Sequence, residues 1–116
     1  MRALALPLLI LAAPLAAEPL DWATVEAQLL DRRLEFTGKQ RGKPVAGLVI
    51  YHKAGQMTVI DRTGKKDRGV WKQQGNRLCT RITSEANARE VCFAVEQGEA
   101  GYTTSHGLTL TPANGG

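Results

Sequence analysis

The chain has 116 residues, with 15 basic and 11 acidic side chains and a formal net charge of +4. This length suits one domain and excludes an architecture of several domains. The mild positive charge favours acidic partners only weakly, because surface charge of this size is largely screened at physiological salt.

The first 17 residues predict a cleavable signal peptide. Arg2 supplies a positive start, residues 3–13 form an apolar stretch, and the segment ends at the small residue Ala17. This order is typical of secretory signals. The apolar stretch is shorter than the roughly 20 residues that a transmembrane helix needs. The sequence therefore predicts a periplasmic or secreted protein whose mature chain, residues 18–116, is one small β domain with no membrane span.

Residues 20–34 predict the one helix of the mature chain. Asp21 can cap its start, and apolar residues then recur at an imperfect helical spacing. Residues 38–44 are polar, basic and rich in turn formers, which predicts a break in regular structure.

From residue 45 onward, short β-prone runs alternate with turn signals of two to five residues, which is typical of an antiparallel meander. The expected strands are residues 48–53, 56–62, 69–74, 77–83, 89–96, 101–105 and 108–111. Residues 112–116 read as a frayed tail. The predicted fold is mainly β: six to eight antiparallel strands in a small barrel or sandwich, with the N-terminal helix over one end or one open face.

The two cysteines, Cys79 and Cys92, predict a structural disulfide. An even cysteine count in a small exported domain favours a disulfide. A redox-active pair is usually closer in sequence, and a metal site would lack further sulfur ligands. A disulfide closing a loop of this length stabilises the fold by about 3 kcal/mol in the chain-entropy model.

A hairpin between residues 77–83 and 89–95 can be aligned so that Cys79 lies opposite Cys92. Extending this register through the neighbouring turns pairs Leu78 with Phe93, Thr80 with Val91, Trp71 with Thr80, and Tyr102 with Phe93. Because side chains alternate along a strand, these apolar residues share one face and the cysteines lie on the other.

The segment from Tyr51 to Cys92 resembles a family of small exported bacterial proteins, domain-of-unknown-function family nine-nine-five. The resemblance rests on Tyr51 before the Gly55 turn, Gly64, Gly69-Val70-Trp71, Leu78-Cys79 and Cys92. It covers about 40 residues and implies no activity. In layout alone, the chain is similar to small periplasmic β-barrel inhibitors of proteases and lysozymes; this is an analogy of fold and implies no function, because their inhibitory motifs do not match residue by residue.

His52 and His106 are the two histidines of the chain, and both are predicted at turns. They could form a metal pair with Met57 as a copper ligand. The alternative is two solvated histidines, because neither has a local His or Cys partner. We expect no metal site and no cofactor.

The serines and glutamates do not form a recognisable catalytic set. Ser84 and Ser105 lack the Gly-x-Ser-x-Gly context of a nucleophile elbow. The glutamates that could pair for glycoside hydrolysis lie at polar turns or strand ends, which are ordinary solvated positions; they are Glu85, Glu90, Glu96 and Glu99. The sequence therefore predicts no catalytic residue.

Two basic clusters are the candidate partner-binding residues: Lys39, Arg41 and Lys43 in one loop, and Lys65, Lys66 and Arg68 in another. They could form a rim for an acidic protein or polymer, or could simply be solubilising turns. Nucleic acid is a poor partner for an exported domain. Trp22, Phe36 and Tyr51 are candidate exposed anchors, with core packing as the alternative.

These observations favour an exported, non-enzymatic binding module, inhibitor-type, that engages an envelope protein or an acidic polymer through its loops. A small-ligand-binding β-barrel carrier is the first alternative. The bulky core face argues against it, since a barrel this short tends to fill its own interior. An enzyme of unrecognised type is the second alternative.

Overall fold

The computed structural model describes residues 18–113, so the predicted signal peptide and residues 114–116 lie outside the described part. The elements in chain order are α1 (Trp22–Leu29), β1 (Leu34–Gln40), β2 (Lys43–Tyr51), β3 (Gln56–Asp61), β4 (Lys66–Gln74), β5 (Arg77–Ile82), β6 (Val91–Phe93), β7 (Val95–Gln97), β8 (Tyr102–Thr104) and β9 (Leu108–Pro112).

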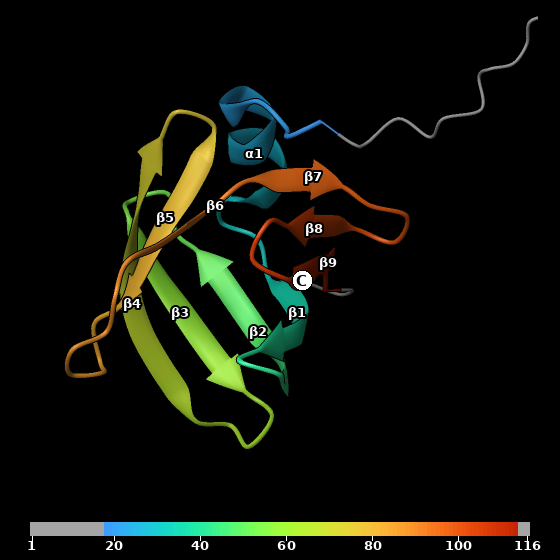
Figure 1. Cartoon of the computed structure of the whole chain (residues 1–116). Helices are drawn as coiled ribbons and strands as arrows, with labels where there is room; N and C mark the ends of the chain where they lie inside the picture. The colour runs from blue at the N-terminus through green and yellow to red at the C-terminus, as the bar shows by residue number, and fades with distance from the viewer. Residues whose placement is uncertain (1–17, 114–116) are drawn as a thin grey trace, which may run out of the picture.

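The strands form one antiparallel sheet of nine strands that curls into a nearly closed barrel (Figure 1). Its order is β6-β5-β4-β3-β2-β1-β9-β8-β7, so each strand in most of the sheet lies beside its neighbour in sequence. The mainly β prediction is confirmed, but the expected number of six to eight strands is too low. Of the two strands beyond the seven expected segments, β1 spans the predicted end of the helix and start of the break, and the other arises because the predicted strand 89–96 is divided into β6 and β7.

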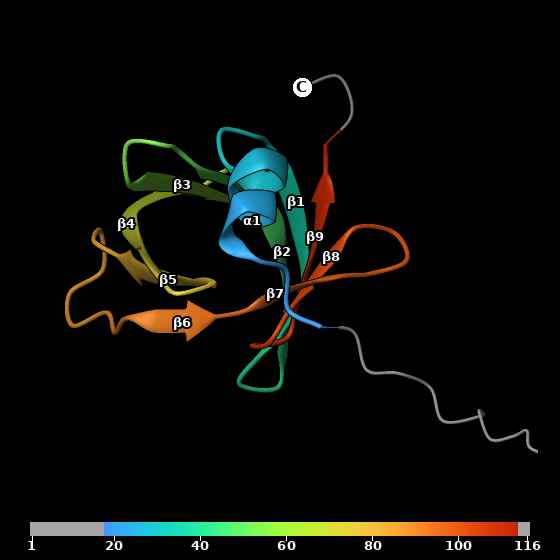
Figure 2. The same ribbon diagram turned by 90° about the horizontal axis from the view of Figure 1, so that it is seen from above.

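Helix α1 is shorter than the predicted span of 20–34. Asp21 caps its start by accepting a hydrogen bond from the Thr24 amide at 2.9 Å. The helix ends because Leu30 is extended and Asp31 adopts a left-handed conformation with φ 62°. Seen from above (Figure 2), α1 lies over one end of the ring of strands, where Val25 and Leu29 are fully buried.

The predicted break at residues 38–44 is wrong, because all of these residues except the two of the turn lie in the strands of a β-hairpin. Strands β1 and β2 pair along their full length from Leu34 to Gln40, with only two residues between them. These two, Arg41 and Gly42, both have positive φ, of 53° and 76°. A two-residue turn with this geometry continues the twist of the strands, so a polar and glycine-rich stretch can remain within the sheet.

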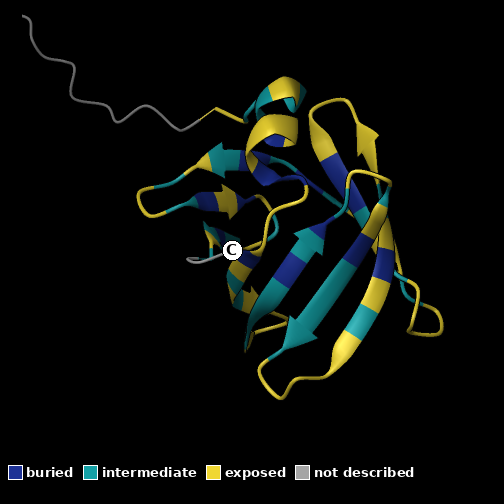
Figure 3. Ribbon diagram, turned by 180° about the vertical axis from the view of Figure 1, so that it is seen from behind, coloured by how far each residue is buried: buried dark blue, intermediate teal, exposed yellow. Residues whose placement is uncertain are grey.

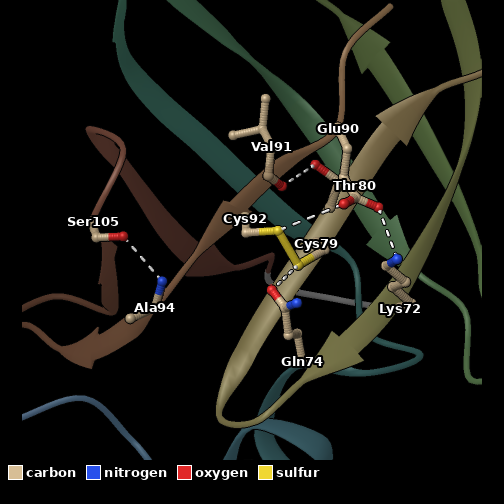
Figure 4. The surroundings of a disulfide bond; sticks show 9 residues. All are labelled: Lys72, Gln74, Cys79, Thr80, Glu90, Val91, Cys92, Ala94 and Ser105. Atoms are coloured by element: carbon tan, nitrogen blue, oxygen red, sulfur yellow. Dashed lines mark hydrogen bonds and ion pairs between the residues drawn. A yellow bond between two sulfur atoms is a disulfide. The ribbon is translucent and has the colours of Figure 1, made fainter.

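The predicted register around the cysteines is confirmed. Cys79 lies opposite Cys92, Leu78 opposite Phe93, Thr80 opposite Val91 and Trp71 opposite Thr80. A disulfide joins the two cysteines between β5 and β6 (Figure 4). Cys79 is fully buried although it lies on the face away from the barrel interior.

One part of the register is wrong: Tyr102 pairs with Gln97 and not with Phe93. The predicted strand 89–96 is divided at Ala94. Its first part, β6, pairs with β5, and its second part, β7, pairs with β8. The two edges of the sheet are therefore consecutive in sequence, and one bent segment nearly closes the barrel.

Buried residues gather toward the α1 end of the barrel, and exposed residues dominate the turns at the other end (Figure 3). Trp22 of the helix packs against Trp71 of β4, with ring centroids 5.8 Å apart. Helix and core close one end of the barrel, and the opposite end is bounded by turns.

Candidate ligand cavity

A cavity of about 1030 Å³ occupies the barrel interior and opens at the end opposite α1. Inward side chains of several strands line its wall, and residues 85–89 of the β5–β6 loop line its mouth. Ligand pockets commonly measure about 300–1,000 Å³, so this volume, which includes the open mouth, suffices for one small molecule. A filled barrel interior, as expected from the bulky core face, is therefore wrong for this end of the molecule.

The cavity runs along most of β2. Lys43, Val45, Val49 and Tyr51 all line it and lie on the same face of the strand. Lys43 is at the turn end, whereas Tyr51 bridges to Leu30, directly after α1. The two residues are eight positions apart in the sequence, which corresponds to about 26 Å along the strand. The cavity is therefore deep, with a mouth at the turns and an inner end near the helix.

Two inward-facing glycines explain why large side chains do not fill this space. Phe36 lies directly opposite Gly47, and a Cβ added to Gly47 would meet the Phe36 ring at 2.8 Å. Likewise, Met57 lies opposite Gly69, and a Cβ there would meet Met57 Cγ at 2.8 Å. Both side chains therefore lie flat along the wall, over backbone that carries no side chain.

The inner end of the cavity is aromatic. Tyr51 is only 3% exposed, and its ring lies 6.5 Å from that of Phe93. The Tyr51 hydroxyl makes no hydrogen bond within the described residues, and burial alone raises its pKa above the ordinary value. Among the described residues, the fully enclosed side-chain atom without a partner is His106 Nδ1, so the Tyr51 hydroxyl keeps access to the cavity and is free to bond a group within it.

His106 stacks on Phe93: the two ring centroids are 4.3 Å apart, and the ring planes form an angle of 16°. It lines the cavity, its Nδ1 is buried without a hydrogen-bond partner, and burial lowers the pKa of its imidazole. His52, by contrast, is not part of the cavity lining, and its Nε2 lies 3.0 Å from Thr58 Oγ1. The structure therefore does not bring the two histidines together with Met57.

The mouth carries more positive than negative side chains. Arg41, Lys43 and Arg89 line it, together with Asp67 and Glu85. None of the three cations is ion-paired within residues 18–113, where the salt bridge found joins Lys72 to Glu90. Asp67 already accepts a hydrogen bond from the Ser84 hydroxyl at 2.9 Å.

The candidate basic residues divide into two groups. Arg41 and Lys43 line the cavity mouth, whereas Lys39, Lys65, Lys66 and Arg68 do not. Lys66 and Arg68 lie opposite Ile60 and Thr58, on the outer face of the sheet. Arg89 was not among the predicted residues, because the loop before β6 carries no signal that it folds over a cavity.

The serines have structural hydrogen bonds. Ser84 bonds Asp67, and the Ser105 hydroxyl accepts a hydrogen bond from the Ala94 amide at 3.0 Å (Figure 4). Among the described residues, one group of potential metal ligands gathers, formed by Cys79, Glu90 and Cys92. Its two sulfurs are already joined in the disulfide, so they are not available as thiolate ligands.

Within residues 18–113, no helix has the length and apolar character needed to cross a membrane. No protein-family model matches the sequence, and no curated protein and no solved structure matches it significantly. The resemblance to family nine-nine-five therefore stays a prediction, and the functional argument rests on the cavity.

Proposed function

We propose that the mature protein is an exported ligand-binding β-barrel that holds one small molecule with an apolar body in its cavity. The observation that carries the proposal is Tyr51, a phenol that is 3% exposed, has no hydrogen-bond partner and lines a cavity of about 1030 Å³. The hydroxyl is not among the fully enclosed atoms without a partner, so it is open to the cavity and available to a ligand. A hydrogen bond from it to a polar group of a ligand would contribute about 0.5–1.5 kcal/mol net.

The cavity wall supports an apolar ligand body. Val49, Val59, Met57 and Phe93 line it, and the last of these is 1% exposed to solvent. Apolar surface removed from water contributes roughly 25 cal/mol per Å². Pockets of mostly apolar lining with a few polar groups are typical of small-molecule sites.

The sharpest test compares two tryptophan substitutions on adjacent residues of β3. Val59→Trp places a large ring into the cavity, whereas Ile60→Trp places it on the outer face, because side chains alternate along the strand. The probe is N-phenyl-1-naphthylamine, an uncharged fluorophore that brightens in apolar surroundings. We expect saturable one-to-one binding to the oxidised mature chain and to Ile60→Trp, and at least tenfold weaker binding to Val59→Trp.

Two results would refute the carrier function. One is the absence of saturable binding to the wild-type chain. The other is equal loss in both variants when circular dichroism shows both to be folded, because the probe would then bind outside the cavity.

A second candidate function is binding of an acidic protein or polymer through the outer basic cluster, Lys65, Lys66 and Arg68. Lys66 and Arg68 lie on the outer face of β4, and none of the three is ion-paired within the described residues. Capture from an envelope extract on immobilised mature chain tests it. A single near-stoichiometric partner that is lost on charge reversal of these three residues supports it, and the absence of any partner contradicts it.

A further inference from the structure

We infer that the ligand is an anionic amphiphile, with its charged head group at the mouth beside Arg41, Lys43 and Arg89 and its apolar chain directed toward Tyr51. This inference rests on the proposed function. It adds the chemical class of the ligand and its orientation.

Three cationic side chains line the mouth of the cavity. Arg41 lies in the β1–β2 turn, Lys43 begins β2 and Arg89 lies in the β5–β6 loop, so cations from two separate parts of the chain line the same opening. None is ion-paired within residues 18–113. Two carboxylates, Asp67 and Glu85, line the same opening, so the three cations exceed the anions by one positive charge.

The two ends of the cavity differ in how well they would hold an anionic head group. The inner end is lined by Tyr51, Met57, Phe93 and the stacked His106, with no Lys or Arg beside them. Burial lowers the pKa of His106, which disfavours its charged form as a partner for an anion. Burying an anion without a charged partner is costly, because the group loses its hydration. At the mouth, the same anion keeps part of its hydration and meets guanidinium and ammonium groups. The head group therefore lies at the mouth.

The end of the ligand chain would lie beside Tyr51. With the head group at the mouth, the chain runs along the wall of β2 toward the unpaired Tyr51 hydroxyl. A neutral hydrogen-bonding group at the end of the chain would meet this hydroxyl. A terminal hydroxyl on the ligand should therefore improve affinity, and the improvement should depend on Tyr51.

Four probes separate these contributions: dodecanoate, 12-hydroxydodecanoate and the methyl esters of both. Titration calorimetry below their aggregation concentrations measures affinity for the oxidised mature chain. We expect each carboxylate to bind about tenfold more tightly than its ester. We also expect the terminal hydroxyl to improve affinity several-fold in the wild type and not in Tyr51→Phe.

Two triple variants provide a matched control, since each removes three positive charges from the same end of the barrel. The variant R41Q/K43Q/R89Q changes the mouth, and K39Q/K66Q/R68Q changes exposed cations that do not line the cavity. We expect the mouth variant to bind carboxylates about tenfold more weakly and esters within twofold of wild type. The outer variant should stay within threefold for all four probes.

Several outcomes overturn the inference. If esters bind as tightly as carboxylates, the head-group assignment is wrong while the carrier function stands. If neither class binds, the carrier function itself fails. If both triple variants lose carboxylate binding equally, general surface charge is responsible and not the mouth. If Tyr51→Phe weakens dodecanoate but not its ester, the head group lies at the inner end.

The anionic head could belong to a free carboxylate or to a phospholipid in a bilayer. Flotation with phosphatidylglycerol vesicles, with and without dodecanoate, separates the two sources. Competition by dodecanoate, together with loss in the mouth variant, places a lipid head group at the same opening. Vesicle binding that depends on the outer cluster and is indifferent to dodecanoate contradicts the inference for lipids.

Discussion

Ser105 binds both main-chain polar groups of Ala94. Its amide donates to the Ala94 carbonyl at 2.9 Å, and its hydroxyl accepts from the Ala94 amide at 3.0 Å. Ala94 is the residue at which the chain passes from β6 to β7 and changes its strand partner. Without these bonds, the point where the barrel closes would leave two main-chain groups without hydrogen bonds.

Removing the Ser105 hydroxyl should therefore weaken the closure. Ser105→Ala leaves the Ala94 amide unpaired, and we expect the free energy of unfolding to fall by about 1–2 kcal/mol. Urea denaturation followed by circular dichroism measures the change. Thr103→Ala, two residues away at an exposed position of β8, is the control and should alter stability by less than about 0.5 kcal/mol. Equal effects in the two variants would contradict the role of Ser105.

The disulfide should contribute more than any single hydrogen bond. Replacing Cys79 and Cys92 together by Ala should lower the free energy of unfolding by about 3 kcal/mol, because the unfolded chain loses a covalent constraint. Urea denaturation of this variant and of the oxidised wild type gives the difference. Intact mass after alkylation should show no free thiol in the wild type. Two alkylated cysteines in that sample would rule out the disulfide.

Gly47→Ala should close part of the cavity. The added Cβ would overlap the main-chain carbonyl oxygen of Ile60 and would also meet the Phe36 ring at 2.8 Å, so both β3 and the ring must move. We expect loss of about 1–3 kcal/mol of stability, as for other overpacked sites, and weaker probe binding. Phe36→Leu in the same chain should restore part of the probe binding, whereas the main-chain overlap keeps most of the stability loss. The absence of any such recovery would mean that the Phe36–Gly47 contact does not shape the cavity.

His106 predicts a pH dependence of stability. Burial lowers its pKa in the folded state, so below about pH 6.5 the unfolded chain binds a proton that the folded chain binds less readily. The free energy of unfolding is therefore highest above that pH, and it decreases as the pH falls from there through the folded-state pKa of His106. His106→Gln should remove this dependence, which denaturation at several pH values measures. An unchanged slope in the variant would assign the effect to another group.

At alkaline pH, Tyr51 should ionise late. Burial raises its pKa above the ordinary value near 10, so the folded state resists losing this proton. The associated stabilisation is present below pH 10 and is lost as the pH rises above it. Absorbance at 295 nm should show a late phase that is missing in Tyr51→Phe. If the additional tyrosine of the wild type instead ionises near pH 10, like an ordinary tyrosine, the burial of this phenol is contradicted.

The hairpin register was predictable because few alignments satisfy both the cysteine pair and the alternation of Leu78, Thr80 and Phe93. Once Cys79 lies opposite Cys92, every other pair in that hairpin follows from the two-residue period of a strand. The partner of Tyr102 was not predictable in the same way. The interruption at Ala94 has no local signal, since it depends on Ser105 approaching from the β8–β9 turn.

The turn at Arg41-Gly42 illustrates a second limit. Polar and basic residues with glycine predict a turn, but they do not say how few residues it takes. Only the positive φ of Arg41 and Gly42 reduces it to two residues and leaves Lys39 and Lys43 within strands. The cavity was hidden for a related reason: Gly47 and Gly69 look like strand-weakening residues until their cross-strand neighbours, Phe36 and Met57, are known.

Binding of a small molecule inside this barrel can be observed at the methyl groups of the barrel wall by NMR. Val59 faces the cavity and the next residue, Ile60, faces outward, so one pair of adjacent methyl groups reports on both sides of the wall. On titration with dodecanoate, we expect saturable chemical-shift changes at the methyl groups of Val59, Val49 and Met57, and little change at Ile60. Shifts confined to Ile60 and other outer methyl groups, or no saturable shift at any of them, would contradict binding inside the barrel.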